Sequence, residues 1–411
     1  MIDLRKHTYF RPLKNDDFLR LFISILTTKI GYWFTFIALF SIFVFEDDLG
    51  AVGIGVLALV QLVPTVVAGP VLSTAVDRFN RGKIILGTEL ASGVVVLLLI
   101  EIRELTLAYA VLFCLGLCSS VAAPAQKALV PQLIEDDDLS AANALVSGAR
   151  SSAQLVGPAV AGSAVAIVDP AVLFAVDASS YFISAVLFVP LLGYDVPGRT
   201  GEPDPSITGD FVDGIKHVAV SPALLLGTAI AVLISLATAS INAMLPFYIR
   251  EVLTLSATAY GWLASATAIG AILASTIIGS GRLETSATLG SIVSMVVLGT
   301  ALFGIATVHS LLFVGIALVV AAFATTSGFT YVTTHMQTAT DDEKMGRVFG
   351  LFRSASSGSR IASIGLSSVL MAQLGSALVF GIIGVIVAFS GCIGYAILRT
   401  RYPNTIAVNN V

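Results

Sequence analysis

Six ionisable side chains lie within long apolar segments of this 411-residue chain, and their types could support chemistry there. A charged group in hydrocarbon costs about 2.5–3.5 kcal/mol on insertion scales, so each of them invites a functional hypothesis. The six are four bases and two acids, namely Lys29, Arg150, Arg353, Arg360, Glu89 and Asp177.

The four bases predict a binding site for an anionic group. Lys29 lies roughly 13 Å along a helix from Arg20, and Arg360 lies about as deep in its own segment. Arg150 and Arg353 lie closer to a segment end. Guanidinium groups suit carboxylate, catecholate or phosphate oxygens. The alternative is that each base pairs with a helix C-terminus, a carbonyl or a carboxylate such as Glu89, and that the two shallower arginines stabilise a gate.

The two acids are the candidates for carrying a coupling proton. Glu89 follows Lys83 by little more than a turn, so we expect it to pair with the basic loop beside it. Asp177 lies early in its segment, where a hydrogen bond to a helix end is the expected role. For both acids, proton carriage is the alternative interpretation.

The composition requires a membrane environment for the elements that position these residues. The chain is 56% apolar and 12% charged, against about 25% charged in soluble domains. Its mean hydropathy is +0.93. A helix needs about 20 apolar residues to cross a bilayer. The sequence therefore predicts an all-α membrane protein with twelve spans, near 21–44, 51–76, 84–100, 105–122, 143–167, 171–192, 222–245, 259–280, 287–307, 310–333, 348–372 and 376–397.

The arrangement of the charges predicts two bundles and their orientation. Residues 1–192 form one six-helix bundle, 193–221 a cytoplasmic linker rich in Pro and Gly, and 222–411 a second six-helix bundle. Most of the 22 Lys and Arg residues fall on one side of the predicted spans. Because basic loops stay in the cytoplasm, we expect both termini there, in a multi-pass protein of the plasma (inner) membrane.

No sequence motif indicates an enzyme or a cofactor. The chain has no nucleotide-binding loop, no dinucleotide fingerprint and no zinc-protease motif. Its four histidines form no cluster, and Cys114, Cys118 and Cys392 are interpreted as packing residues. We therefore expect no catalytic residue, no metal, no cofactor and no nucleic-acid partner. An ion gradient must supply the energy, unless transport is only facilitated.

The segment 73–83 resembles the signature loop of the major facilitator superfamily. Its charged positions are matched by Asp77, Arg78 and Arg81. Ser73 and Asn80 stand where the family has glycine, so the match is partial. The resemblance implies two six-helix bundles that rock about a central site. It also implies a charged latch between helices, which we expect these three residues to form together with Arg353.

A second motif is similar to the antiporter motif of exporters in this superfamily. It is carried by Gly157, Pro158 and Gly162. Small residues let a neighbouring helix approach closely, and the proline permits a bend. Further matches along most of the chain resemble one exporter branch, which includes macrolide efflux proteins and the enterobactin exporter. The alternative interpretation of the motif is generic small-residue packing.

The resemblance also implies where the substrate binds. In the family architecture spans 1, 5 and 11 line the central cavity, and all four bases lie on them, whereas both acids lie on peripheral spans. Tyr32 stands where members of the branch often have an acidic residue. The expected substrate-binding residues are Lys29, Tyr32, Arg150, Gln154, Asn242 and Arg360.

The expected function is secondary active export of amphipathic small molecules, either drug-like compounds or siderophores. Export would proceed by alternating access, coupled to protons by antiport. The expected partners are a small-molecule substrate, for which the four bases favour an anion, together with protons and the lipid bilayer. The protein is expected to be a monomer. Two alternatives remain open, a transporter-like receptor or scaffold without net flux, and an uptake carrier for an organic anion.

Overall fold

The computed structural model describes residues 8–67, 80–101, 104–193, 218, 221–280, 286–340 and 344–401. Long helices account for most of these residues, and none of the described residues lies in a strand. The first six long helices are α1 Asp16–Phe40, α2 Ala51–Val67, α4 Arg81–Glu101, α5 Leu105–Leu133, α6 Leu139–Ala164 and α7 Pro170–Phe188. The second six are α9 Pro222–Glu251, α10 Ala257–Gly279, α11 Ala287–Thr307, α12 Leu311–Thr338, α13 Met345–Leu374 and α14 Ser376–Arg401.

Each of the twelve predicted spans corresponds to a helix, although residues 68–76 of the second span lie outside the described residues. Within the described residues, nine helical segments are long and apolar enough to cross a membrane. The three other long helices are α2, of which 17 residues are described, and α6 and α13. The last two are the most polar, because they carry Arg150, Arg353 and Arg360 together with many serines. A polar membrane helix must turn its polar groups away from lipid, so α6 and α13 are the helices from which sites are expected.

The chain divides into two compact units. Unit 1 contains Met1–Leu49, Val56–Thr200 and Leu255–Ser265, and unit 2 contains Gly50–Gly55, Gly201–Thr254 and Ala266–Val411. Each unit is therefore built mainly from one half of the chain. The predicted linker, 193–221, lies almost entirely outside the described residues. The boundaries at its two ends stay predictions.

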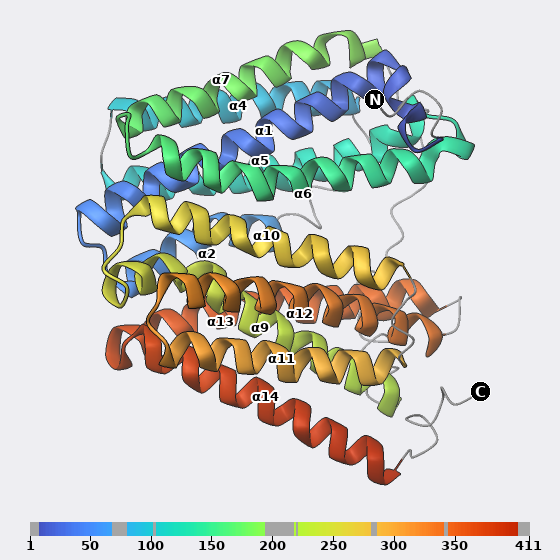
Figure 1. The fold of residues 1–411 in the computed structure, drawn as a ribbon. Helices are drawn as coiled ribbons and strands as arrows, with labels where there is room; N and C mark the ends of the chain where they lie inside the picture. The colour runs from blue at the N-terminus through green and yellow to red at the C-terminus, as the bar shows by residue number, and fades with distance from the viewer. Residues whose placement is uncertain are drawn as a thin grey trace, which may run out of the picture. The chain divides into compact units, whose positions relative to one another are not determined.

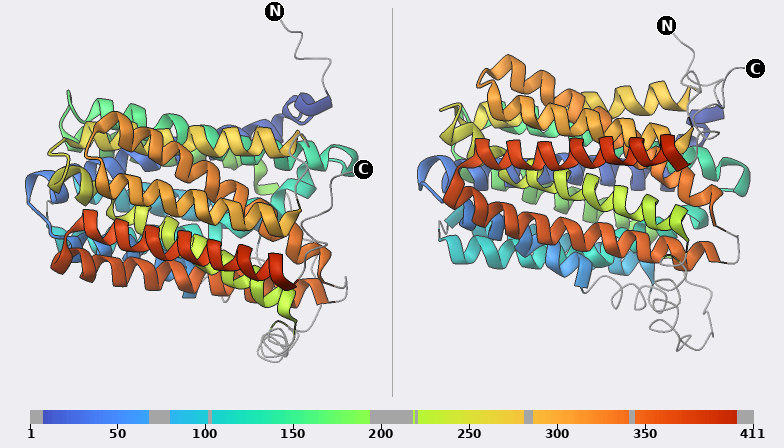
Figure 2. Two further views of the ribbon diagram at one scale, coloured as in Figure 1. Left: turned by 60° about the horizontal axis from the view of Figure 1, so that its bottom comes forward. Right: turned by 90° about the horizontal axis from the view of Figure 1, so that it is seen from below.

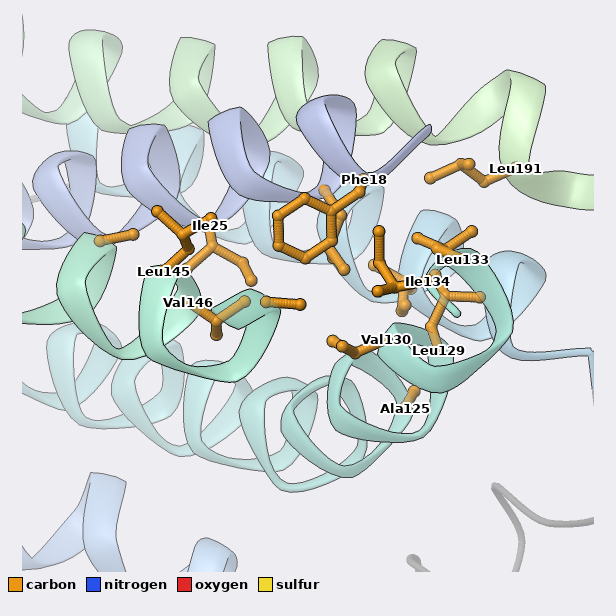
Figure 3. Packing of buried hydrophobic residues seen from close by; sticks show 14 of the residues in the cluster. Phe18, Ile25, Ala125, Leu129, Val130, Leu133, Ile134, Leu145, Val146 and Leu191 are labelled. Carbon is orange, nitrogen blue, oxygen red and sulfur yellow. The ribbon is translucent and has the colours of Figure 1, made fainter. Parts of the chain in front are cut away.

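In unit 1, α1 packs against both α6 and α7, and α4 packs against α5 and α7, as Figure 1 shows. Two apolar clusters hold these helices together. The first cluster joins α1, α5 and α6 through residues such as Phe18, Leu133 and Val146 (Figure 3). The second cluster joins α1, α4, α5 and α7 around Leu112 and Phe174.

In unit 2, α11 lies beside α12 and α14, and α13 packs against α9 (Figure 2). The contact between α11 and α14 depends on two glycines that bring the backbones together. A Cβ at Gly384 would lie 2.7 Å from both the carbonyl oxygen of Gly299 and the amide nitrogen of Phe303. Without a strong hydrophobic force between helices in lipid, such close packing supplies much of the association energy.

We expect Gly384→Val to destabilise unit 2 by about 1–3 kcal/mol, because the new side chain must push α11 and α14 apart. Gly394→Val on the same helix is the matched control, since a Cβ there would lie 3.5 Å from Ile292 Cδ1, an ordinary contact. The measurement is the Tm of the purified protein in detergent. Equal Tm values for the two variants would show that the glycine contact does not hold the helices together.

Candidate functional site

A cavity of about 180 Å³ lies inside unit 1, and residues of α1, α4, α5, α6 and α7 line it. Three of the six ionisable membrane residues contribute to its wall, Lys29 from α1, Glu89 from α4 and Arg150 from α6. The remaining polar lining consists of hydroxyl, amide and thiol groups, on Thr28, Thr88, Ser92, Ser119, Gln126, Cys118 and Tyr181. Each of the five helices therefore contributes at least one polar group to the cavity wall.

The cavity occupies the layer between the two apolar clusters of unit 1. On α1, Lys29 falls between Ile25 of the first cluster and Ala38 of the second. On α4, Glu89 likewise falls between Ile85 and Val96. Apolar packing above and below thus isolates a polar layer near the middle of the helices, and the charges in it are far from either helix end.

Three contacts set the rotation of α1 and so the direction of Lys29. Asn15 caps α1, and its amide donates to the carbonyl oxygen of Leu133, 2.8 Å away. The hydroxyls of Ser24 and Ser184 are hydrogen-bonded at 2.6 Å. Together with Gly31, which packs directly on α7, these contacts turn one face of α1 to α7 and leave Lys29 on the cavity wall.

Glu89 is the most buried charged group of the cavity. Only 4% of its surface is exposed, and its Oε2 atom has no hydrogen-bond partner among the described residues. The Nε atom of Arg150 is also buried without a described partner. Lys29 interacts electrostatically with Arg150, Glu89 and Asp177, yet it forms no ion pair within 4.0 Å of a described acid. The two cations and the carboxylate of the cavity therefore lie near one another without forming a direct ion pair.

Asp177 of α7 is fully buried behind this wall. The hydroxyl of Ser180 donates to its Oδ1 at 3.4 Å, and its Oδ2 has no partner among the described residues. A Cβ at Gly31 would lie 2.7 Å from Asp177 Oδ1 and would collide with Ser180. Asp177 thus occupies the α1–α7 contact and is not part of the cavity lining, although its charge acts on Lys29.

The other predicted substrate-binding residues lie elsewhere. The Tyr32 hydroxyl donates to Oε1 of Gln61 on α2 at 2.9 Å, and Gln154 is exposed on α6. Asn242, Arg353 and Arg360 belong to unit 2, where each is exposed. The proposal that these residues join Lys29 and Arg150 around one substrate stays a prediction.

The residues predicted to form a latch are only partly described. Asp77 and Arg78 lie outside the described residues. Arg81 begins α4, and its Nη1 donates to the carbonyl oxygen of Ala128 on α5 at 2.8 Å. Arg81 therefore joins the start of α4 to α5, and a role in a latch with Arg353 stays a prediction.

The predicted antiporter motif lies on the buried face of α6. Gly157, Pro158 and Gly162 are all buried. Gly157 lies against the indole ring of Trp33 on α1, where any side chain would collide with that ring. Gly157 thus lets α6 approach α1 closely, about two turns beyond Arg150, and Gly162 lies against the backbone of Gly261 on α10.

Within unit 1, the structure corrects the expectation that bases and acids are separated. Glu89 lines the cavity together with Lys29 and Arg150, whereas most of the basic loop with which it was expected to pair lies outside the described residues. In the structure Gly82, Ile85, Glu89, Ser92 and Val96 form one buried stripe on α4. The sequence carries no strong periodic signal for that stripe, because the other faces of α4 are also apolar. Tyr181 and the hydroxyls of the lining were also not predicted.

Among the described residues, no group of three or more His, Cys, Asp or Glu side chains could hold a metal ion. The cavity instead offers ammonium, guanidinium, hydroxyl and amide donors around one carboxylate. Such a set can bind a small anion, ordered water or a proton.

The family model of the Major Facilitator Superfamily matches residues 21–364 and 227–410 of the chain. Together these matches cover nearly the whole length, so the chain belongs to the major facilitator superfamily. It is a membrane transporter and not an enzyme.

Relatives and solved structures agree with this assignment. The chain is 25% identical over 392 residues to the uncharacterised transporter YfiS of Bacillus subtilis, covering 91% of each protein. It is 24% identical over 234 residues to macrolide efflux protein A of Streptococcus pyogenes, which covers 54% of this chain and 55% of that protein. The chain is 24% identical over 176 residues to the staphyloferrin A transporter of Staphylococcus aureus. This match covers 41% of this chain and 44% of that protein.

Two solved transporters share the fold at low sequence identity. The nucleoside transporter NupG aligns with a TM-score of 0.76 at 11% identity, covering 92% of this chain and 100% of that one. A peptide transporter bound to alafosfalin aligns with a TM-score of 0.75 at 12% identity, covering 95% and 94%. At such identities the similarity establishes the fold alone.

Proposed function

We propose that this transporter exports amphipathic small molecules, drug-like compounds or siderophores, by alternating access coupled to proton antiport. It would act as a monomer in the plasma (inner) membrane, with both termini in the cytoplasm. The observation that carries the proposal is Glu89, a buried carboxylate that shares a membrane cavity with Lys29 and Arg150. A carboxylate held at such cost within membrane helices is suited to binding and releasing a proton.

The direction and the substrate class are supported by sequence. Gly157 and Pro158 form the core of an antiporter-like motif, and their close packing on α1 is consistent with one. Two relatives are named as a macrolide efflux protein and a staphyloferrin A transporter. Macrolides and siderophores are both amphipathic and rich in oxygen. They share the chemistry that Lys29, Tyr32, Arg150, Gln154, Asn242 and Arg360 could recognise.

The cavity of unit 1 is too small for the body of such a substrate. Drug-sized ligands occupy pockets of about 300–1,000 Å³, whereas this cavity measures about 180 Å³. The body of the substrate must therefore bind outside it. The cavity would couple the substrate site to protons through Lys29 and Arg150 of its wall.

The test is the sidedness of transport in proteoliposomes that contain the purified protein. With a proton gradient directed against substrate movement, we expect a macrolide or an iron-free siderophore to accumulate. Collapse of the gradient should abolish the accumulation. Binding without flux would identify a receptor, and accumulation of an organic anion in the same direction as protons would identify an uptake carrier. Either outcome would contradict the proposal.

A further inference from the structure

The unit 1 cavity contains polar groups that lack partners and so require an occupant. Glu89 is 4% exposed with Oε2 unpartnered, and Arg150 Nε is buried without a described partner. Lys29 lines the same space, although its side chain is exposed where Glu89 is buried. Buried polar groups without partners are costly, so native proteins fill such places with water, ions or ligand groups.

The size of the cavity limits what that occupant can be. A partly open cavity of about 180 Å³ has room for several water molecules. A halide ion or a short carboxylate with a few waters would fit, whereas a macrolide or a whole siderophore would not. The occupant is therefore distinct from the body of any drug-sized substrate.

The charges of the cavity favour an anion. Its wall has two cations, Lys29 and Arg150, against one carboxylate, so it carries a net charge of +1 while Glu89 is ionised and +2 once Glu89 is protonated. The other titratable groups that face Glu89 are Cys118 of α5 and Asp177 and Tyr181 of α7. Of these, only Asp177 adds negative charge, and it lies behind the wall.

We propose that this cavity binds one small monoanionic group, a halide or a carboxylate, between Lys29 and Arg150, and that binding is linked to protonation of Glu89. An ionised Glu89 repels the anion, whereas a protonated Glu89 can donate a hydrogen bond to it. By linkage, anion binding must then favour protonation of Glu89 by the same factor. The cavity would accept a proton and an anion together.

The experiment measures the Tm of the full-length protein in detergent while chloride or acetate replaces the bulkier gluconate at constant ionic strength. We expect a saturable rise in Tm, with a lower apparent Kd at about pH 5.5 than at about pH 8. Octanoate is titrated in parallel. Stabilisation by chloride or acetate would identify a free small anion as the occupant. Stabilisation by octanoate alone would identify the acid group of an amphiphile as the occupant. Either result, with the small anions or with octanoate, would support the site.

Three variants make the test specific. Lys29→Gln should remove the saturable rise, and Glu89→Gln should keep it at an affinity that no longer depends on pH. Lys14→Gln, an exposed cation that precedes α1, is the matched control and should behave as the wild type. Because Glu89→Gln predicts retained binding, the test remains decisive if Lys29→Gln does not fold.

Two outcomes would overturn the proposal. One is a Tm that does not respond to any of the three anions in the wild type or in Glu89→Gln. The other is a saturable rise that Lys29→Gln retains in full. Neither requires transport, so a failure of this proposal is distinguishable from a failure to observe export in proteoliposomes.

Discussion

Glu89→Gln is expected to uncouple transport from the proton gradient, with a loss of accumulation of at least about ten-fold. Glutamine preserves the shape of the side chain but cannot bind and release a proton. Exchange of labelled for unlabelled substrate without a gradient should persist, because it needs only the alternation of the two units. The measurement compares gradient-driven accumulation with counterflow in the same proteoliposomes.

The matched control is Glu101→Gln, since Glu101 is exposed at the C-terminal end of α4. It should accumulate substrate as the wild type does. If Glu89→Gln also accumulates substrate normally, Glu89 is not the coupling carboxylate. Asp177, the other buried acid of unit 1, would then be the residue to replace by asparagine.

Lys29→Gln is expected to lower transport by about ten-fold or more. The size of the loss should depend on whether Glu89 is present as a charged neighbour. Without Lys29, Glu89 keeps only Arg150 as a cation in the cavity, and a less compensated charge in a membrane bundle is costly. Adding Glu89→Gln removes that charge. The free energy of unfolding of the double variant should therefore exceed the value expected from adding the two single changes. The difference, which is the interaction energy, should be about 0.5–3 kcal/mol.

A double-mutant cycle on Tm, with counterflow as the second measurement, tests this prediction. Lys14→Gln again serves as the control, since that exposed cation lies outside the cavity. Strictly additive effects of the two cavity changes would mean that Lys29 and Glu89 do not interact. The shared cavity would then have no role in coupling.

The signs of the charges constrain which substrates can be exchanged for protons. An anionic group that binds between Lys29 and Arg150 favours a protonated Glu89, so the anion and the proton bind together. A cationic group that approaches Glu89 competes with the proton instead. Antiport through this cavity therefore suits substrates that present a cation or a neutral donor to Glu89. An acid group in the cavity would move in the same direction as its proton.

The sequence alone determined the number of helices, their approximate bounds and the family. Hydropathy is a local property of a segment, so each predicted span appears as a helix, from α1 to α14. The exceptional polarity of α6 and α13 is likewise visible in their own residues. The charged positions in these helices can also be singled out from the sequence, because any ionisable residue in a membrane span is costly.

Only the tertiary structure decided which of those charges share a space. Glu89 lines the same cavity as Lys29 and Arg150. It does so because contacts between residues distant in sequence set how each helix is rotated about its own axis. The hydrogen bond between Ser24 and Ser184 and the packing of Gly31 on α7 are two such contacts. A helix of uniformly apolar character has no strong periodic signal to reveal that rotation. Its neighbours therefore fix whether an acid faces lipid, a loop or a cavity.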